Sequence, residues 1–149
     1  MFANMGAFIT AIAFSNHTGS DEIKDYAGLS RRSPALAAMM AVFMLSLVGI
    51  PPLAGFMGKY YLFSSAIEKG YIWLVVVAIL TSVISLYYYL GVVRQMYFQN
   101  STEENPAVIT ISPALRTALI ISVIGVLLFG ILPHIFLNLA NQAAMVFLY

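Results

Sequence analysis

Lys59 is the one charged residue in a long apolar run from Ala35 to Ile67. A lysine near the centre of a bilayer costs on the order of 3 kcal/mol, so such residues usually face the interior of a helix bundle and have a function there. A lysine that exchanges between its charged and neutral forms can pass on a proton. The pattern therefore indicates proton translocation through Lys59. The alternative is that Lys59 extends to the nearer membrane surface and has no such role.

Two adjacent prolines precede this lysine. Pro51 and Pro52 have no N–H, so the carbonyls of Leu47 and Val48 lose their helical partners, and the proline rings clash with the preceding turn. In hydrocarbon, freed backbone groups are tolerated only where neighbouring protein or a water-filled cavity receives them. The Lys59 head, roughly 10 Å further along the helix, can reach back toward the freed carbonyls. The sequence thus predicts a helix break beside a polar interior, formed by Gly49, Pro51, Pro52, Gly55 and Gly58.

The composition is that of an integral membrane protein. Hydrophobic residues make up 61% of the 149 residues, charged residues make up 9%, and the net charge is +1. A net charge this small does not indicate a nucleic-acid-binding surface. The absence of cysteine excludes disulfides, iron–sulfur ligation and thiol catalysis within this chain. With no dinucleotide, phosphate-loop, nucleophile-elbow or paired-histidine motif, we expect neither a catalytic residue nor a metal or other cofactor site in this chain.

The lengths of the apolar segments predict the helices that position Lys59. We predict an all-α polytopic transmembrane bundle, since ~20 apolar residues cross a membrane as a helix. The first segment is too short to span, so we interpret it as the end of a helix and the chain as a C-terminal fragment of a larger membrane domain. The predicted segments are about 1–14 (partial span), 35–67 (broken at 49–55), 71–93 and 113–132, followed by a short interfacial helix near the C-terminus.

Residues 35–67 allow either one broken span or a hairpin of two half-length helices. A single span places the loops that contain Lys24, Arg31, Arg32 and Arg94 on one side, with Lys69 alone opposite. The positive-inside rule prefers this more asymmetric arrangement. We therefore expect one discontinuous span with its basic loops in the cytoplasm. A second polar loop, over residues 99–112, contains Glu103, Glu104, Asn105 and Pro106 as helix breakers.

Three hydroxyl groups share one face of the span over residues 71–93. Ser82, Ser85 and Tyr89 lie three or four residues apart. They form a possible polar lining that holds water beside Lys59. Hydrogen bonding between helices explains the same pattern equally well.

The segment from Asp25 to Phe63, followed by LTSVISLYYYLGVVRQMY, carries a specific resemblance. It resembles the C-terminal third of subunit N, or mitochondrial subunit 2, among the antiporter-like subunits of proton-pumping NADH:quinone oxidoreductase (respiratory complex I). The resemblance implies a discontinuous helix whose ionisable residue serves the proton exit path, here Lys59. The related subunit M has a glutamate at this position, and the tyrosine run Tyr87–Tyr89 also favours subunit N.

The resemblance further implies a non-redox translocase subunit in a bacterial inner membrane. NADH, FMN, iron–sulfur clusters and quinone would be bound by other subunits of the complex. The partners would be other membrane-arm subunits, the lipid bilayer, protons and internal water. The family's other relay residues lie on earlier helices with no counterpart here. Two alternatives remain: a subunit of a related cation/proton antiporter or membrane-bound hydrogenase, and a structural packing element of a membrane complex.

Overall fold

The computed structural model describes residues 1–100, 109 and 111–146, with side chains described in that range except at 141 and 144–146. Within these residues the chain is all-helical, and the predicted helix bundle is confirmed. Residues Glu103, Glu104, Asn105 and Pro106 of the predicted second loop lie outside the described part. The elements are α1 (Phe2–Thr18), the 3-10 helix η1 (Ile23–Tyr26), α2 (Leu29–Arg32), α3 (Pro34–Val48), α4 (Ala54–Glu68), α5 (Ile72–Phe98), α6 (Pro113–Ile131) and α7 (Pro133–Val146).

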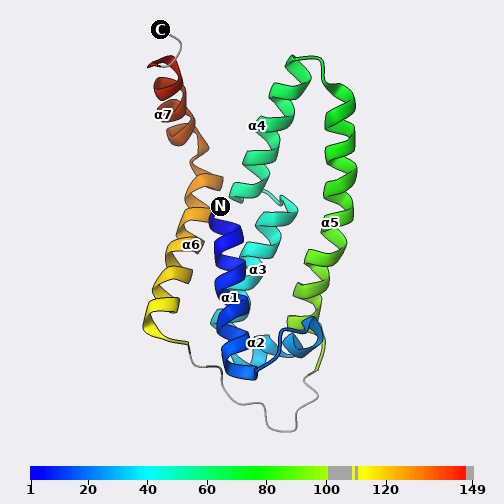
Figure 1. Cartoon of the computed structure of the whole chain (residues 1–149), viewed down its shortest axis with the longest axis vertical. Helices are drawn as coiled ribbons and strands as arrows, with labels where there is room; N and C mark the ends of the chain where they lie inside the picture. Colours follow the sequence, from blue (N-terminus) through cyan, green and yellow to red (C-terminus); the bar gives the residue numbers. More distant parts are fainter. Residues whose placement is uncertain (101–108, 110, 147–149) are drawn as a thin grey trace.

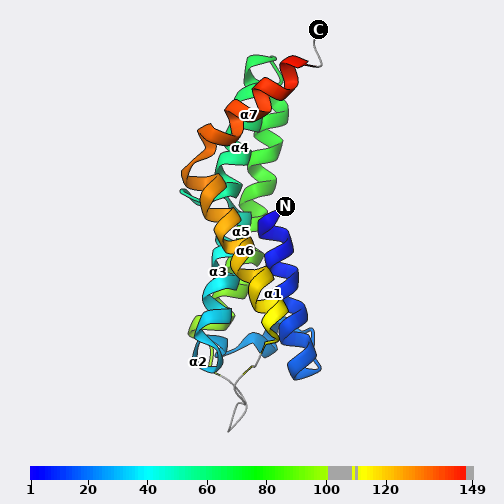
Figure 2. The same ribbon diagram turned by 90° about the vertical axis from the view of Figure 1, so that its left-hand side faces the viewer.

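Helices α3 and α4 follow one another along the long axis of the molecule, as both ribbon views show (Figures 1 and 2). A hairpin would have placed α4 back alongside α3. Instead α4 continues away from α3, and α5 returns along both of them, in contact with each. Helices α3 and α4 therefore lie end to end as the two halves of an interrupted helix. The interruption covers residues 49–53, which is narrower than the predicted 49–55.

Helix α1 packs against both α3 and α6. At each contact an aromatic ring lies against a glycine of the neighbouring helix. A Cβ atom at Gly6 would collide with the fully buried ring of Phe43, and a Cβ at Gly125 would collide with the ring of Phe2. The absence of a side chain therefore lets these helices approach closely. This packing holds α1 against both α3 and α6.

Helix α1 extends four residues beyond the predicted segment 1–14 and ends at Thr18, followed by Gly19, whose φ is +70°. The polar residues 15–18 continue the helix, because polar side chains at a helix end are readily solvated. The connection to α3 is also ordered. Ser20 donates a hydrogen bond to Asp25, and the ring of Tyr26 stacks on Phe14 with ring centroids 4.0 Å apart.

Two described helices are long and apolar enough to cross a membrane by themselves, α5 and α6. Helix α5 extends to Phe98, past the predicted end at residue 93. Pro133 follows the end of α6 but also begins α7, where the missing N–H of a first-turn proline costs nothing. Helix α7, predicted as an interfacial helix, continues beyond α6 toward the same end of the molecule as α4 (Figures 1 and 2).

Candidate functional site

The site begins with the way in which α3 ends. Gly49 has a φ of +94°, which favours glycine, and its N–H donates to the carbonyls of Leu45 and Ser46 at 3.1 and 3.0 Å. The N–H of Ile50 donates to the Leu45 carbonyl at 3.1 Å. These bonds form a Schellman motif, which satisfies two of the four terminal carbonyls of the helix. The carbonyls of Leu47 and Val48 remain available to another donor.

Lys59 supplies that donor from the other side of the break. Its Nζ donates to the Val48 carbonyl at 2.9 Å and to the Leu47 carbonyl at 3.3 Å. This is the contact expected from the sequence. The C-terminal end of a helix carries a partial negative charge, so an ammonium group is stabilised there. The lysine of α4 thus caps α3, and the two half-helices form one unit.

The N-terminal end of α4 is held in a complementary way. The N–H of Gly55, in the first turn of α4, donates to the Ser46 hydroxyl at 3.1 Å. Ser46 is fully buried, and a Cβ atom at Gly55 would collide with the Ser46 carbonyl oxygen. Sequence reasoning missed Ser46. The available signal is that it is the one polar side chain in α3 and lies in the last turn before the break.

Helix α6 packs directly on the break. A Cβ atom at Gly130 would collide with the Pro52 carbonyl oxygen and would also lie 2.7 Å from the backbone of Leu53. Gly130 was not predicted, because a single glycine in an apolar helix gives no specific signal. By contrast Gly58, predicted as part of the break, lies inside α4, and nothing described lies within 4 Å of a Cβ there.

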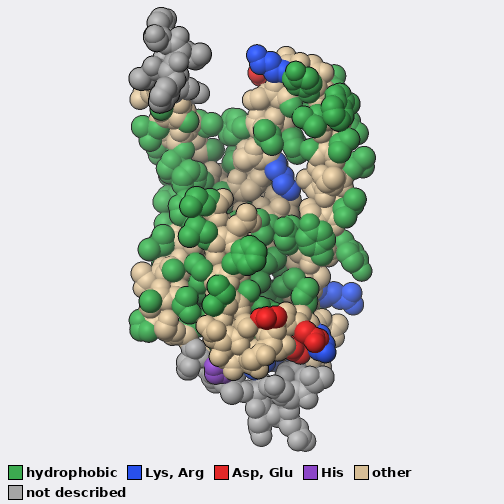
Figure 3. Space-filling view, viewed as in Figure 1, with side chains coloured by type: hydrophobic (Ala, Val, Ile, Leu, Met, Phe, Trp, Pro, Cys, Tyr) green, Lys and Arg blue, Asp and Glu red, His purple; other side chains and the backbone are tan. Residues whose placement is uncertain are grey.

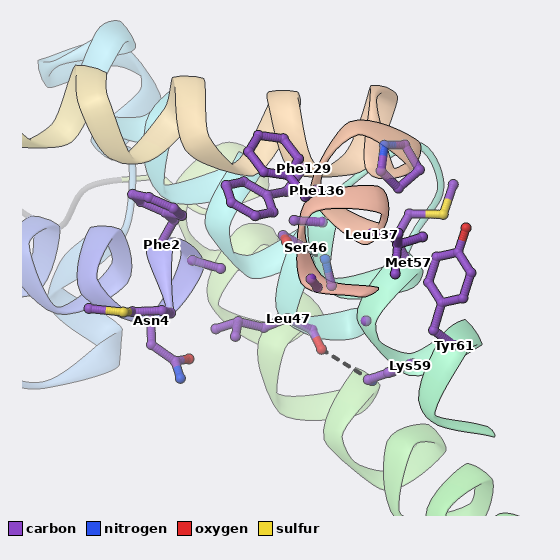
Figure 4. Close-up of a pocket in the computed structure, with 17 residues that line it drawn as sticks. Phe2, Asn4, Ser46, Leu47, Met57, Lys59, Tyr61, Phe129, Phe136 and Leu137 are labelled. Carbon is purple, nitrogen blue, oxygen red and sulfur yellow. Dashed lines mark hydrogen bonds between the residues drawn. The ribbon is translucent and has the colours of Figure 1, made fainter. Parts of the chain in front are cut away.

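Lys59 lies between two hollows on different sides of α4. The larger, of about 750 Å³, is bounded by α1, α3, α4, α6 and α7, and Ser46 and Gly55 also line it. Figure 4 shows Lys59 reaching Leu47 at one side of this hollow and the rings of Phe129 and Phe136 at the other. These two rings stack with centroids 3.8 Å apart. The walls of this hollow are thus mainly apolar, with Lys59 and Ser46 supplying polar groups at the break.

The second hollow, of about 530 Å³, lies between α4 and α5. Ser82 lines it together with Lys59, whereas Ser85 and Tyr89 are not among its lining residues. The hydroxyls of Ser82 and Ser85 donate to carbonyls of their own helix, both at 2.8 Å, and Tyr89 packs against the apolar core. Of the three predicted lining residues, Ser82 is the one that lines a hollow together with Lys59.

Lys59 lies apart from the charged side chains near the ends of the molecule. In the space-filling view, the charged side chains gather toward the ends of the molecule, and a basic patch lies midway along α4 (Figure 3). The one lysine within α4 is Lys59. Its side chain is half-buried between the hollows. Among the described residues, no group of three or more histidine, cysteine, aspartate or glutamate side chains could hold a metal ion.

Comparison with known proteins gives consistent results. Residues 1–85 match the sequence family described as NADH:quinone oxidoreductase/Mrp antiporter, TM. The chain is 50% identical over 147 residues to NADH-quinone oxidoreductase subunit N of Moorella thermoacetica, a match that covers 99% of this chain and 31% of that protein. It is 44% identical over 144 residues to subunit N of Desulfitobacterium hafniense, covering 97% and 29% of the two chains.

A solved structure agrees with these sequence matches. One chain of respiratory complex I from Thermus thermophilus with bound Aureothin superposes with a TM-score of 0.68 at 36% identity, covering 78% of this chain and 26% of that chain. This chain therefore spans about 30% of the length of the curated relatives that it matches.

Proposed function

This chain belongs to the NADH:quinone oxidoreductase/Mrp antiporter transmembrane family, and from that premise we propose that it relays protons across a membrane through Lys59. In this proposal it is an integral membrane subunit of a multisubunit NADH:quinone oxidoreductase. Lys59 accepts a proton on one side of the interrupted helix and releases it on the other. No bond of a substrate is made or broken by this chain.

The hydrogen bonds of Lys59 across the break are the observation that carries the proposal. Its Nζ donates hydrogen bonds to the carbonyls of Val48 and Leu47, so the side chain is held at the break. Hollows on two sides of α4 give the same side chain two directions of approach. An amine that is held in place and reached from two directions is suited to receive and deliver a proton.

The redox chemistry of the complex belongs to other subunits in this proposal. NADH oxidation and quinone reduction would change the charge or conformation around Lys59 from a distance, and this chain would bind no redox cofactor. The chain contains no cysteine for iron–sulfur ligation, which supports the assignment. Other membrane subunits, lipid and internal water are its expected partners. Bacterial relatives favour a bacterial inner membrane as its location.

The test is the variant Lys59→Met in the assembled complex, reconstituted in proteoliposomes. We expect NADH-driven quinone reduction to continue while proton pumping per electron falls. The matched control is Lys69→Met, since Lys69 is an exposed lysine directly after α4. Proton pumping equal to the wild type in a fully assembled Lys59→Met complex would refute the proposal. Normal turnover and pumping per assembled complex, with less of the complex assembled, would instead favour a packing role.

A second candidate is a subunit of a cation/proton antiporter, because the family description includes Mrp antiporters. The relatives reported above are named NADH-quinone oxidoreductase subunit N, which favours the first candidate. The two are distinguished by the host complex. Proton movement that depends on sodium and proceeds without NADH-linked quinone reduction would support the antiporter.

A further inference from the structure

A buried serine lies at the junction of the two half-helices, beside the proposed relay lysine. The Ser46 hydroxyl accepts a hydrogen bond from the N–H of Gly55 at 3.1 Å. The N–H groups in the first turn of a helix have no acceptor within that helix. Ser46 therefore supplies from α3 an acceptor that α4 cannot supply for itself.

The backbones of the same two residues are in direct contact. There is no space for a Cβ atom at Gly55, because it would collide with the Ser46 carbonyl oxygen. One hydrogen bond and one close backbone contact thus fix the first turn of α4 against the last turn of α3. Lys59 lies four residues after Gly55, about one helical turn along α4, so its location depends on the location of that turn.

We propose that Ser46 is a positioning residue for Lys59. By holding the first turn of α4 on α3, its hydroxyl keeps the Lys59 Nζ within hydrogen-bonding distance of the Val48 and Leu47 carbonyls. Ser46 lines the same hollow as Lys59 but is not itself a proton carrier in this account. The inference rests on the proposed function of Lys59 in proton transfer.

The functional test compares three variants in the assembled complex, reconstituted in proteoliposomes. Ser46→Ala removes the acceptor with little change in volume, and we expect at least a twofold loss of proton pumping per electron. Ser46→Thr keeps the hydroxyl and is expected to pump like the wild type. Ser122→Ala is the matched control, because Ser122 is also a buried serine but lies in α6. Equal pumping by Ser46→Ala and Ser46→Thr, at any level, would overturn the inference.

A structural readout separates this inference from the proposed function. We expect amide hydrogen exchange in the first turn of α4 to be roughly fivefold faster in Ser46→Ala, the size expected from the loss of one hydrogen bond. Ser122→Ala should leave this exchange unchanged. Normal pumping by Lys59→Met would refute the proton relay, while the exchange result would still report whether Ser46 joins the half-helices. Reduced pumping by Lys59→Met with unchanged exchange in Ser46→Ala would refute the role of Ser46 alone.

Discussion

Lys59 donates a hydrogen bond from its Nζ to the carbonyl oxygen of Val48, 2.9 Å away and eleven residues earlier in the chain. The bond spans the interruption between α3 and α4. It joins the residue proposed to carry the proton to the backbone group that the two prolines deprive of a helical donor. The break and the lysine are therefore parts of a single arrangement.

An arginine at position 59 separates proton exchange from helix capping. The guanidinium of Lys59→Arg retains donors for the Val48 and Leu47 carbonyls, but it does not release its proton in a protein. We expect an assembled complex whose quinone reduction is preserved and whose proton pumping is reduced as much as in Lys59→Met. The measurement is protons pumped per NADH oxidised in proteoliposomes. Pumping near the wild-type level would mean that Lys59 acts only through its charge.

Two glycines of α4 provide a matched pair of substitutions. In Gly55→Ala the new methyl group collides with the Ser46 carbonyl oxygen, whereas in Gly58→Ala nothing described lies within 4 Å of it. We expect Gly55→Ala to destabilise the protein by about 1–3 kcal/mol, as overpacking does. Gly58→Ala should be neutral or stabilise it by up to about 1 kcal/mol. Thermal denaturation in detergent measures both, and equal melting temperatures would contradict the close contact at the break.

Substitution of Gly49 tests whether the end of α3 holds Lys59 in place. Gly49 and Gly19 both have positive φ, +94° and +70°, so alanine at either position costs about 1 kcal/mol in backbone strain. A Cβ atom at Gly49 would also lie 3.2 Å from the Lys59 side chain, while nothing lies within 4 Å at Gly19. We expect both variants to lose stability but only Gly49→Ala to lose proton pumping. An equal loss of proton pumping in Gly49→Ala and Gly19→Ala would contradict the prediction.

The ordered connection between α1 and α3 predicts a dependence on alkaline pH. Burial, and secondarily the Asp21 carboxylate, raise the pKa of Tyr26 above its ordinary value. The folded state therefore favours the neutral phenol. This contribution to stability is complete below about pH 10 and is lost as the pH rises through the raised pKa.

Tyr26→Phe removes this ionisation while it keeps an aromatic ring against Phe14. We expect the stability of the wild type relative to Tyr26→Phe to decline above about pH 10. Melting temperatures of the two proteins, measured in detergent from neutral to alkaline pH, provide the comparison. A constant difference between them across that range would contradict the prediction.

Much of the arrangement around Lys59 follows from local rules. Prolines in a helix free particular carbonyls, and a lysine one or two turns later can reach them, so the contact with Val48 was predictable. The choice of one interrupted span over a hairpin followed from the charges of Lys24, Arg31, Arg32 and Arg94 relative to Lys69. Both inferences use residues that are close in sequence or rules that apply along the whole chain.

The features that were not predicted depend on which helices become neighbours. The sequence alone does not show the role of Ser46, because that role depends on the contact with Gly55. The role of Gly130 likewise depends on its contact with Pro52. Conversely Gly58, assigned to the break by its proximity in sequence, lies within a regular helix. The α1 boundary was placed too early because polar residues at a helix end give the same pattern as a loop.

The two groups that accept hydrogen bonds from Lys59 are peptide carbonyls. A carboxylate partner would keep its full negative charge after the lysine gave up its proton, and would attract that proton back. Peptide dipoles do not titrate and carry only partial charge. Deprotonation of Lys59 would therefore leave no oppositely charged side chain behind among the groups that accept its hydrogen bonds.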